Sequence, residues 1–167
     1  RSVDLRPVRT KRLRDDFHTI GYLRITQFSE SVPKKIEEAI EELKDKEVEG
    51  IILDLRNNSG GLVSSGIAVA DSFLSQKPIV ETKDRNGIKD AIISQKETSF
   101  DGPMVTLVNK GTASASEILA GSLQDNDRSI LMGEQTYGKG LIQSLKSLGE
   151  ESGIAITVAS YLTPKGN

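Results

Sequence analysis

The fold is decided by a strand pattern and a turn pattern that follow one another in the stretch Gly50-Ile-Ile-Leu-Asp-Leu-Arg-Asn-Asn-Ser-Gly-Gly61. Its first half, residues 50–55, is a short continuous apolar run, which is typical of a strand buried on both faces of a sheet. Its second half is a turn with two consecutive glycines. An amphipathic helix follows, with apolar residues at helical spacing: Val63, Ile67, Ala70 and Leu74. A buried strand, a turn and a helix in this order indicate an α/β fold.

The same alternation extends in both directions from this stretch. Strand 20–28 and a helix that begins after Ser31, with the serine hydroxyl as N-cap, precede it. The segments predicted after it are a hairpin of 78–85 with 88–94 around Asn86-Gly87, strand 104–109, helix 118–124, strand 129–133 and extended segments 141–145 and 153–160. This order predicts one α/β domain with a largely parallel central sheet.

The composition of the 167 residues fits a globular domain and excludes several classes of function. The net charge is −2, which argues against a nucleic-acid partner, and we interpret the basic cluster Arg6–Arg14 as a solvated strand edge. There is no cysteine, so disulfides, thiol nucleophiles and cysteine metal sites are excluded. No His, Asp and Glu residues have metal-ligand spacing, so we expect neither a metal nor a cofactor.

Residues 133–140, Gly-Glu-Gln-Thr-Tyr-Gly-Lys-Gly, fit the phosphate-loop pattern G-x-x-x-x-G-K-[ST] except at the last position. Gly140 has no hydroxyl to offer magnesium. A phosphate loop also needs a helix directly after the lysine, whereas residues 141–145 have the pattern of extended chain. Nucleotide binding is therefore a minor alternative.

A serine nucleophile is the stronger candidate. Residues 109–117, Asn-Lys-Gly-Thr-Ala-Ser-Ala-Ser-Glu, pass from a buried strand into a helix through small residues. A serine on such a turn exposes its hydroxyl beside a backbone N–H, which is the arrangement found in a nucleophile elbow. The alternative interpretation is that Ser114 or Ser116 only caps the helix.

Such a serine needs a base. The single histidine, His18, lies in a charged segment that we assign to the surface, and no feature of the sequence places it near Ser114. A neutral lysine can replace histidine. Lowering a lysine pKa by about three units takes roughly 4 kcal/mol, supplied by burial away from acids. Lys139 is the best candidate, because its neighbours are small or apolar and Glu134 is the only nearby acid.

These residues resemble a known family. Residues 111–143 resemble the signature block of the carboxyl-terminal processing (tail-specific) serine proteases, and residues 49–62 and 20–28 fit the same family. The form of residues 136–143 is most similar to the photosynthetic branch that processes the D1 precursor of photosystem II.

The resemblance implies a serine endopeptidase with a Ser/Lys dyad and an acyl-enzyme. The family's dyad residues lie 25 positions apart, which selects Ser114 and Lys139 and leaves Ser116 out. A glutamine four residues after the lysine orients the amine, which corresponds to Gln143. The family's oxyanion hole corresponds to the backbone N–H groups of Gly60 and Ala115.

The resemblance further implies a crotonase-like (ClpP-like) α/β core, without metal or cofactor. It implies protein or peptide substrates with an accessible C-terminus, membrane proteins among them, and a location in the periplasm, cell envelope or thylakoid lumen. Residues 1–167 would be the protease catalytic core, with the family's PDZ domain and C-terminal segment missing. Two alternatives share this fold: a catalytically silent peptide-binding module and a crotonase-like acyl-CoA enzyme.

Overall fold

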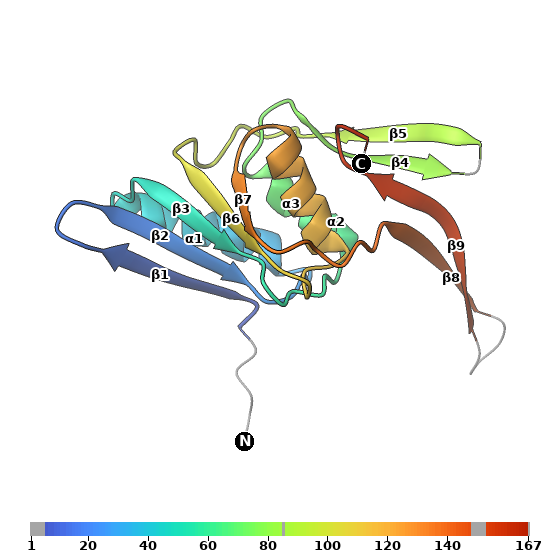
Figure 1. Ribbon diagram of the computed structural model, residues 1–167, viewed down its shortest axis with the longest axis horizontal. Helices are drawn as coiled ribbons and strands as arrows, with labels where there is room; N and C mark the ends of the chain where they lie inside the picture. The colour runs from blue at the N-terminus through green and yellow to red at the C-terminus, as the bar shows by residue number, and fades with distance from the viewer. Residues whose placement is uncertain (1–5, 85, 148–152, 167) are drawn as a thin grey trace, which may run out of the picture.

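The structure, a computed structural model, describes residues 6–84, 86–147 and 153–166, and the backbone alone for 88–89, 142–147 and 153–159. Within the described residues two sheets and three helices form the domain (Figure 1). The elements, in chain order, are β1 (Val8–Arg14), β2 (Thr19–Ile25), α1 (Val32–Asp45), β3 (Gly50–Asp54), α2 (Val63–Asp71), β4 (Pro78–Asp84), β5 (Gly87–Ile93), β6 (Met104–Val108), α3 (Ala115–Asp125), β7 (Ile130–Gly133), β8 (Leu141–Ser147) and β9 (Gly153–Leu162).

The larger sheet has the strand order β1-β2-β3-β6-β7 in the described part of the chain. Strands β2, β3, β6 and β7 run parallel, and β1 pairs antiparallel with β2. The predicted α/β fold with a mostly parallel central sheet is therefore confirmed. The basic strand β1 is largely exposed at the edge of this sheet, as the sequence indicated.

The smaller sheet has the order β5-β4-β9-β8, and all its described neighbours are antiparallel. The predicted β4–β5 hairpin is present, but Gly87 already pairs with Asp84. Gly87 is therefore the first residue of β5 and not a residue of the turn, which differs from the expected Asn86-Gly87 turn. Because 141–147 is strand β8, no helix opens after Lys139, and the phosphate-loop interpretation is wrong.

Helix α3 lies between the two sheets (Figure 1). Most of the helix is buried, and Ala115 and Leu119 are fully inaccessible. Helix α1 buries one apolar face: Val32, Ile36, Ala39, Ile40 and Leu43. Ser31 is at its N-cap position, but its hydroxyl does not cap the helix, because the residue has helical dihedrals (φ −81°, ψ −11°) and not the extended ones that a capping side chain needs.

Three loops meet at one edge of the larger sheet because they follow parallel neighbours. Residues 55–62 follow β3, residues 109–114 follow β6 and residues 134–140 follow β7. The carboxyl ends of adjacent parallel strands are the usual place for a ligand in an α/β sheet. The predicted serine, lysine and glycine pair lie on these three loops.

Candidate active site

Ser114 has the backbone conformation of a strained elbow. Its φ is 57° and its ψ is −119°, a region that residues with a side chain rarely occupy. It lies immediately before the first residue of α3, and its side chain is partly exposed. Strain of this kind at a strand-to-helix turn is how a nucleophilic serine is presented in the elbow of α/β hydrolases.

Ser116 has a different environment. It is fully buried, and its Oγ donates a hydrogen bond to the carbonyl oxygen of Asn58 at 3.0 Å. A hydroxyl that is buried and occupied in this way supports the fold and is not free to attack a substrate. The geometry therefore favours Ser114 over Ser116 as the reactive residue.

The glycine loop packs directly on Ser114. Gly60 has φ +103°, and a Cβ atom on it would lie 2.9 Å from Ser114 Cβ and 3.2 Å from Ala115 N. The buried Asn58 fixes this loop, because its Nδ2 donates to Ile25 O at 3.0 Å and its carbonyl oxygen accepts from Ala113 N at 3.0 Å. The structure thus brings Gly60 and Ala115 together beside Ser114.

The two predicted oxyanion donors, the N–H groups of Ala115 and Gly60, differ in whether they already donate a hydrogen bond. The N–H of Ala115, in the first turn of α3, has no intrahelical acceptor and donates to none of the residues that the structure describes. The N–H of Gly60 instead donates to Asn58 Oδ1 at 2.9 Å. This donor is therefore occupied, because the Asn58 side chain forms a local turn with the residue two positions on.

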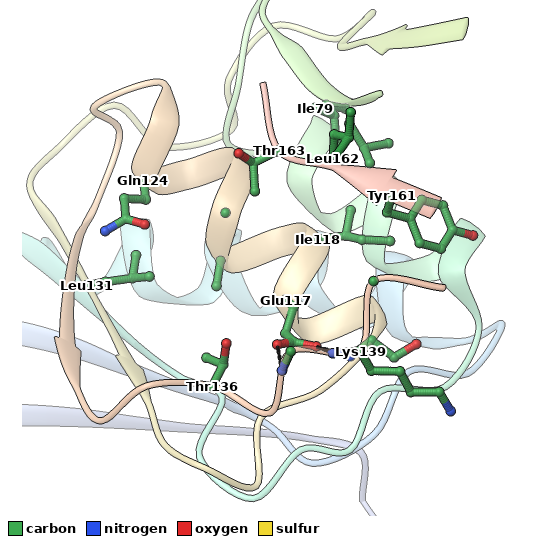
Figure 2. A pocket seen from close by; sticks show the side chains of 16 residues that line it. Ile79, Glu117, Ile118, Gln124, Leu131, Thr136, Lys139, Tyr161, Leu162 and Thr163 are labelled. Atoms are coloured by element: carbon green, nitrogen blue, oxygen red, sulfur yellow. Dashed lines mark hydrogen bonds between the residues drawn. The ribbon is translucent and has the colours of Figure 1, made fainter. Parts of the chain in front are cut away.

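Lys139 reaches the same site from the loop after β7, but its side chain is exposed. Figure 2 shows it extending outward, away from the Glu117 carboxylate. Among the residues that the structure describes, no hydrogen bond joins Lys139 Nζ to Ser114 Oγ. The expectation of a buried lysine is wrong for this conformation, because the apolar neighbours Tyr137 and Leu141 are themselves 71% and 54% exposed and do not cover it.

Ser114 and Lys139 line one cavity of about 330 Å³. Its remaining wall is mostly apolar and comes from β4, α3, β7 and β9, with Ile79, Ile118, Leu131 and Leu162 labelled in Figure 2. Such a cavity beside a serine hydroxyl could hold an apolar side chain of a bound polypeptide.

Comparison with known proteins identifies the family of this chain. Residues 19–167 match the sequence model of the family described as "Peptidase family S41". The chain belongs to peptidase family S41. The carboxyl-terminal-processing protease of Synechocystis sp. is 50% identical over 147 residues, which cover 88% of this chain and 34% of that protein. The carboxy-terminal processing protease CtpA of Bacillus subtilis is 40% identical over 164 residues, or 98% of this chain and 35% of that protein.

A solved structure, that of a photosystem II D1 C-terminal processing protease, superposes with a TM-score of 0.91. It is 37% identical and the match covers 99% of this chain and 46% of that one. The S41 chain thus spans about a third of the two curated relatives and under half of the solved one.

A residue that the sequence reasoning missed in this S41 site is Glu117. Its Oε2 accepts hydrogen bonds from Ser114 N at 2.8 Å and Lys139 N at 2.9 Å, and its Oε1 accepts one from Gly138 N at 2.6 Å. The signal was available, because Ser114 and Glu117 form the S-x-x-E pattern of a capping box. Gln143 lies on β8 and pairs with Thr157, but its side chain is outside the described residues.

A buried carboxylate anchors the start of the glycine loop. Asp54 is fully inaccessible, accepts a hydrogen bond from Tyr22 Oη at 2.6 Å, and is chelated by Arg56 through Nε at 2.9 Å and Nη2 at 2.7 Å. Burial by itself would raise the pKa of Asp54, but the hydrogen bonds from Arg56 and Tyr22 outweigh it and lower this pKa to about 2.

His18 does not line the cavity of the site. His18 is exposed, its Nδ1 lies 3.0 Å from Glu49 Oε2, and this contact raises its pKa, so the surface role is confirmed. No cluster of potential metal ligands occurs among residues 6–84, 86–147 and 153–166. In the same part of the chain, no helix has both the length and the apolar character to cross a bilayer.

Proposed function

We propose that this S41 chain carries the catalytic centre of a serine endopeptidase that cuts protein substrates near their C-terminus. The observation that carries the proposal is the strained elbow at Ser114, which opens into the cavity that Lys139 also lines. The processing proteases among its relatives support the reaction class.

In the proposed mechanism, the neutral amine of Lys139 removes the proton from Ser114 Oγ while the oxygen attacks the scissile carbonyl carbon. The oxyanion of the tetrahedral intermediate accepts hydrogen bonds from Ala115 N–H and Gly60 N–H. Lys139 then gives the proton to the leaving amine, and an acyl-enzyme remains on Ser114. Water, activated by the same lysine, releases the acyl group.

Two local changes precede this reaction. The Lys139 side chain has to turn inward, and the Gly60 N–H has to leave Asn58 Oδ1 for the oxyanion. The loops that carry these groups already contact Ser114 and the first turn of α3. In the proposal, the side chain of Gln143 orients the inward lysine.

The finer assignments rest on the family resemblance. We propose a crotonase-like (ClpP-like) core, a substrate with an accessible C-terminus, and an extracytoplasmic location. A relative from Tetradesmus obliquus that is 45% identical is named as a chloroplastic C-terminal processing peptidase, which supports the location. In the full-length protein a PDZ domain would present the substrate to this core.

The test compares the full-length protein with Ser114→Ala and Lys139→Ala, using a quenched fluorescent peptide with a free C-terminus. We expect both variants to lose at least about 10³-fold in kcat, because each removes a member of the dyad. Lys110→Ala, which changes an exposed lysine on the same turn, is the matched control and should cleave at the wild-type rate. Equal cleavage by all four proteins would refute the mechanism and favour a silent peptide-binding module.

The pH dependence gives a second test. Only a deprotonated lysine accepts the serine proton, so the rate should rise with pH. A rate that is constant between about pH 6 and 9 counts against lysine as the base.

A further inference from the structure

The carboxylate of Glu117 joins the two halves of the proposed dyad. Glu117 is in the first turn of α3 and accepts three backbone hydrogen bonds. One donor is the N–H of Ser114, and the other two are the N–H groups of Gly138 and Lys139, 21 and 22 positions further along the chain. Figure 2 shows these bonds converging on the labelled Glu117 side chain.

A helix cap alone would not need the last two bonds. Capping satisfies free N–H groups of the helix itself, which the Ser114 bond already does. The bonds to Gly138 and Lys139 instead hold a segment that belongs to the loop after β7. Hydrogen bonds to an ionised carboxylate are shorter and stronger than bonds between neutral groups, so they suit this purpose.

The side chains of this part of the loop contribute little to its position. Gly138 is exposed, has φ +84°, and a Cβ atom on it would meet nothing within 4 Å. The side chains of Tyr137 and Lys139 are exposed as well. The neighbouring backbone anchors are the bond from Tyr137 N to Thr112 O at 3.0 Å and the bond from Tyr161 N to Gly140 O at 2.7 Å. Between these two anchors, Glu117 accepts the hydrogen bonds of the Gly138 and Lys139 N–H groups and so sets the position of the Lys139 backbone.

We propose that Glu117 is a positioning residue that sets where Lys139 stands relative to Ser114. This inference rests on the proposed Ser/Lys mechanism. The Glu117 carboxylate holds the backbone of Ser114 and the backbone of Lys139. The Lys139 side chain therefore turns inward from a fixed backbone position. Misplacement of a reacting group by about 1 Å can cost on the order of 10²-fold in rate.

The experiment uses full-length protein with Glu117→Ala and Glu117→Gln, with kcat and KM measured on the same quenched peptide. Alanine removes all three acceptors, and we expect kcat to fall about 10²-fold with KM within about threefold of wild type. Glutamine keeps one accepting oxygen and turns the other into a donor, so we expect a partial loss of about tenfold. The control is Glu134→Gln, an exposed carboxylate at the start of the same loop, which should keep the wild-type kcat.

Two further readouts separate positioning from general stability. A fluorophosphonate probe reports how readily Ser114 Oγ attacks without a peptide in the cavity, and its labelling rate should fall by the same factor as kcat. Hydrogen exchange of the amides of Gly138 and Lys139 should be slow in wild type despite their exposure, and at least tenfold faster in Glu117→Ala. The thermal unfolding midpoint shows whether the variants remain folded at the assay temperature.

The outcomes distinguish this inference from the proposed function. If Ser114→Ala and Lys139→Ala are inactive but folded Glu117→Ala keeps kcat and the labelling rate within about twofold of wild type, the positioning role is wrong and the dyad stands. If alanine and glutamine at position 117 lose the same activity without faster exchange at 138–139, the carboxylate acts by its charge and the inference is also wrong. If the dyad variants themselves cleave normally, the proposed function fails first.

Discussion

The stability of this chain should depend on pH through one buried side chain, Asp54. Its carboxylate is fully inaccessible and is held by Arg56 and Tyr22 beneath the start of the glycine loop. The perturbation that isolates it is Asp54→Asn, which keeps the size of the side chain and removes its charge.

The magnitude follows from the pKa of Asp54. In the folded state hydrogen bonds lower it to about 2 from the ordinary 3.8. One pKa unit corresponds to 1.36 kcal/mol, so the ionised carboxylate contributes roughly 2 kcal/mol to the free energy of unfolding. Between these two pKa values the unfolded chain binds more protons than the folded chain. The contribution is therefore complete above about pH 4 and is lost as the pH falls towards about 2.

The assay is urea unfolding followed by circular dichroism between pH 7 and pH 2, for wild type, Asp54→Asn and the exposed control Asp16→Asn. The difference in free energy of unfolding between wild type and Asp54→Asn should shrink by about 2 kcal/mol between pH 5 and pH 2. The same difference for Asp16→Asn should change much less. A difference for Asp54→Asn that stays constant with pH would show that the buried carboxylate does not act through its ionisation.

Two further substitutions test the architecture around Ser114. Gly60→Ala should destabilise the fold by about 2–4 kcal/mol in urea unfolding and lower kcat, because φ is +103° and the new Cβ would lie 2.9 Å from both Ala113 O and Ser114 Cβ; a fully active variant of unchanged stability contradicts this packing. Ser116→Ala should cost about 1 kcal/mol of stability by losing the bond to Asn58 O, and should leave fluorophosphonate labelling of Ser114 intact. Loss of labelling in folded Ser116→Ala would reverse the assignment of the two serines.

The parts of this structure that could be predicted from sequence are those that local pattern controls. Continuous apolar runs identified β3 and β6, and the small residues between β6 and α3 identified the turn that carries Ser114. The 25-residue spacing from the family resemblance separated Ser114 from Ser116, and the burial of Ser116 agrees with that choice.

The parts that could not be predicted depend on which of several possible contacts a group makes in the folded chain. The apolar neighbours of Lys139 suggested burial, but sequence does not say that Tyr137 and Leu141 face outward. The Gly60 N–H has a partner in the side chain of Asn58, two residues away, and sequence does not rank that partner against a substrate oxyanion. The bonds from Gly138 and Lys139 to Glu117 join residues over 20 positions apart, so no local pattern contains them.

The path that the chain takes between Ser114 and Lys139 explains why their interval has little freedom of length. From Ser114 the 11 residues of α3 lead roughly 16 Å away, and β7 with its flanking residues returns to the same edge of the sheet. At the far end Arg128 donates to the carbonyl oxygens of Phe73, Phe100 and Gly102, which fixes the turning point. One residue more or fewer in α3 would rotate everything beyond it by about 100°. The fold therefore fixes the length of the interval, and an insertion or deletion within it should move Lys139 away from Ser114.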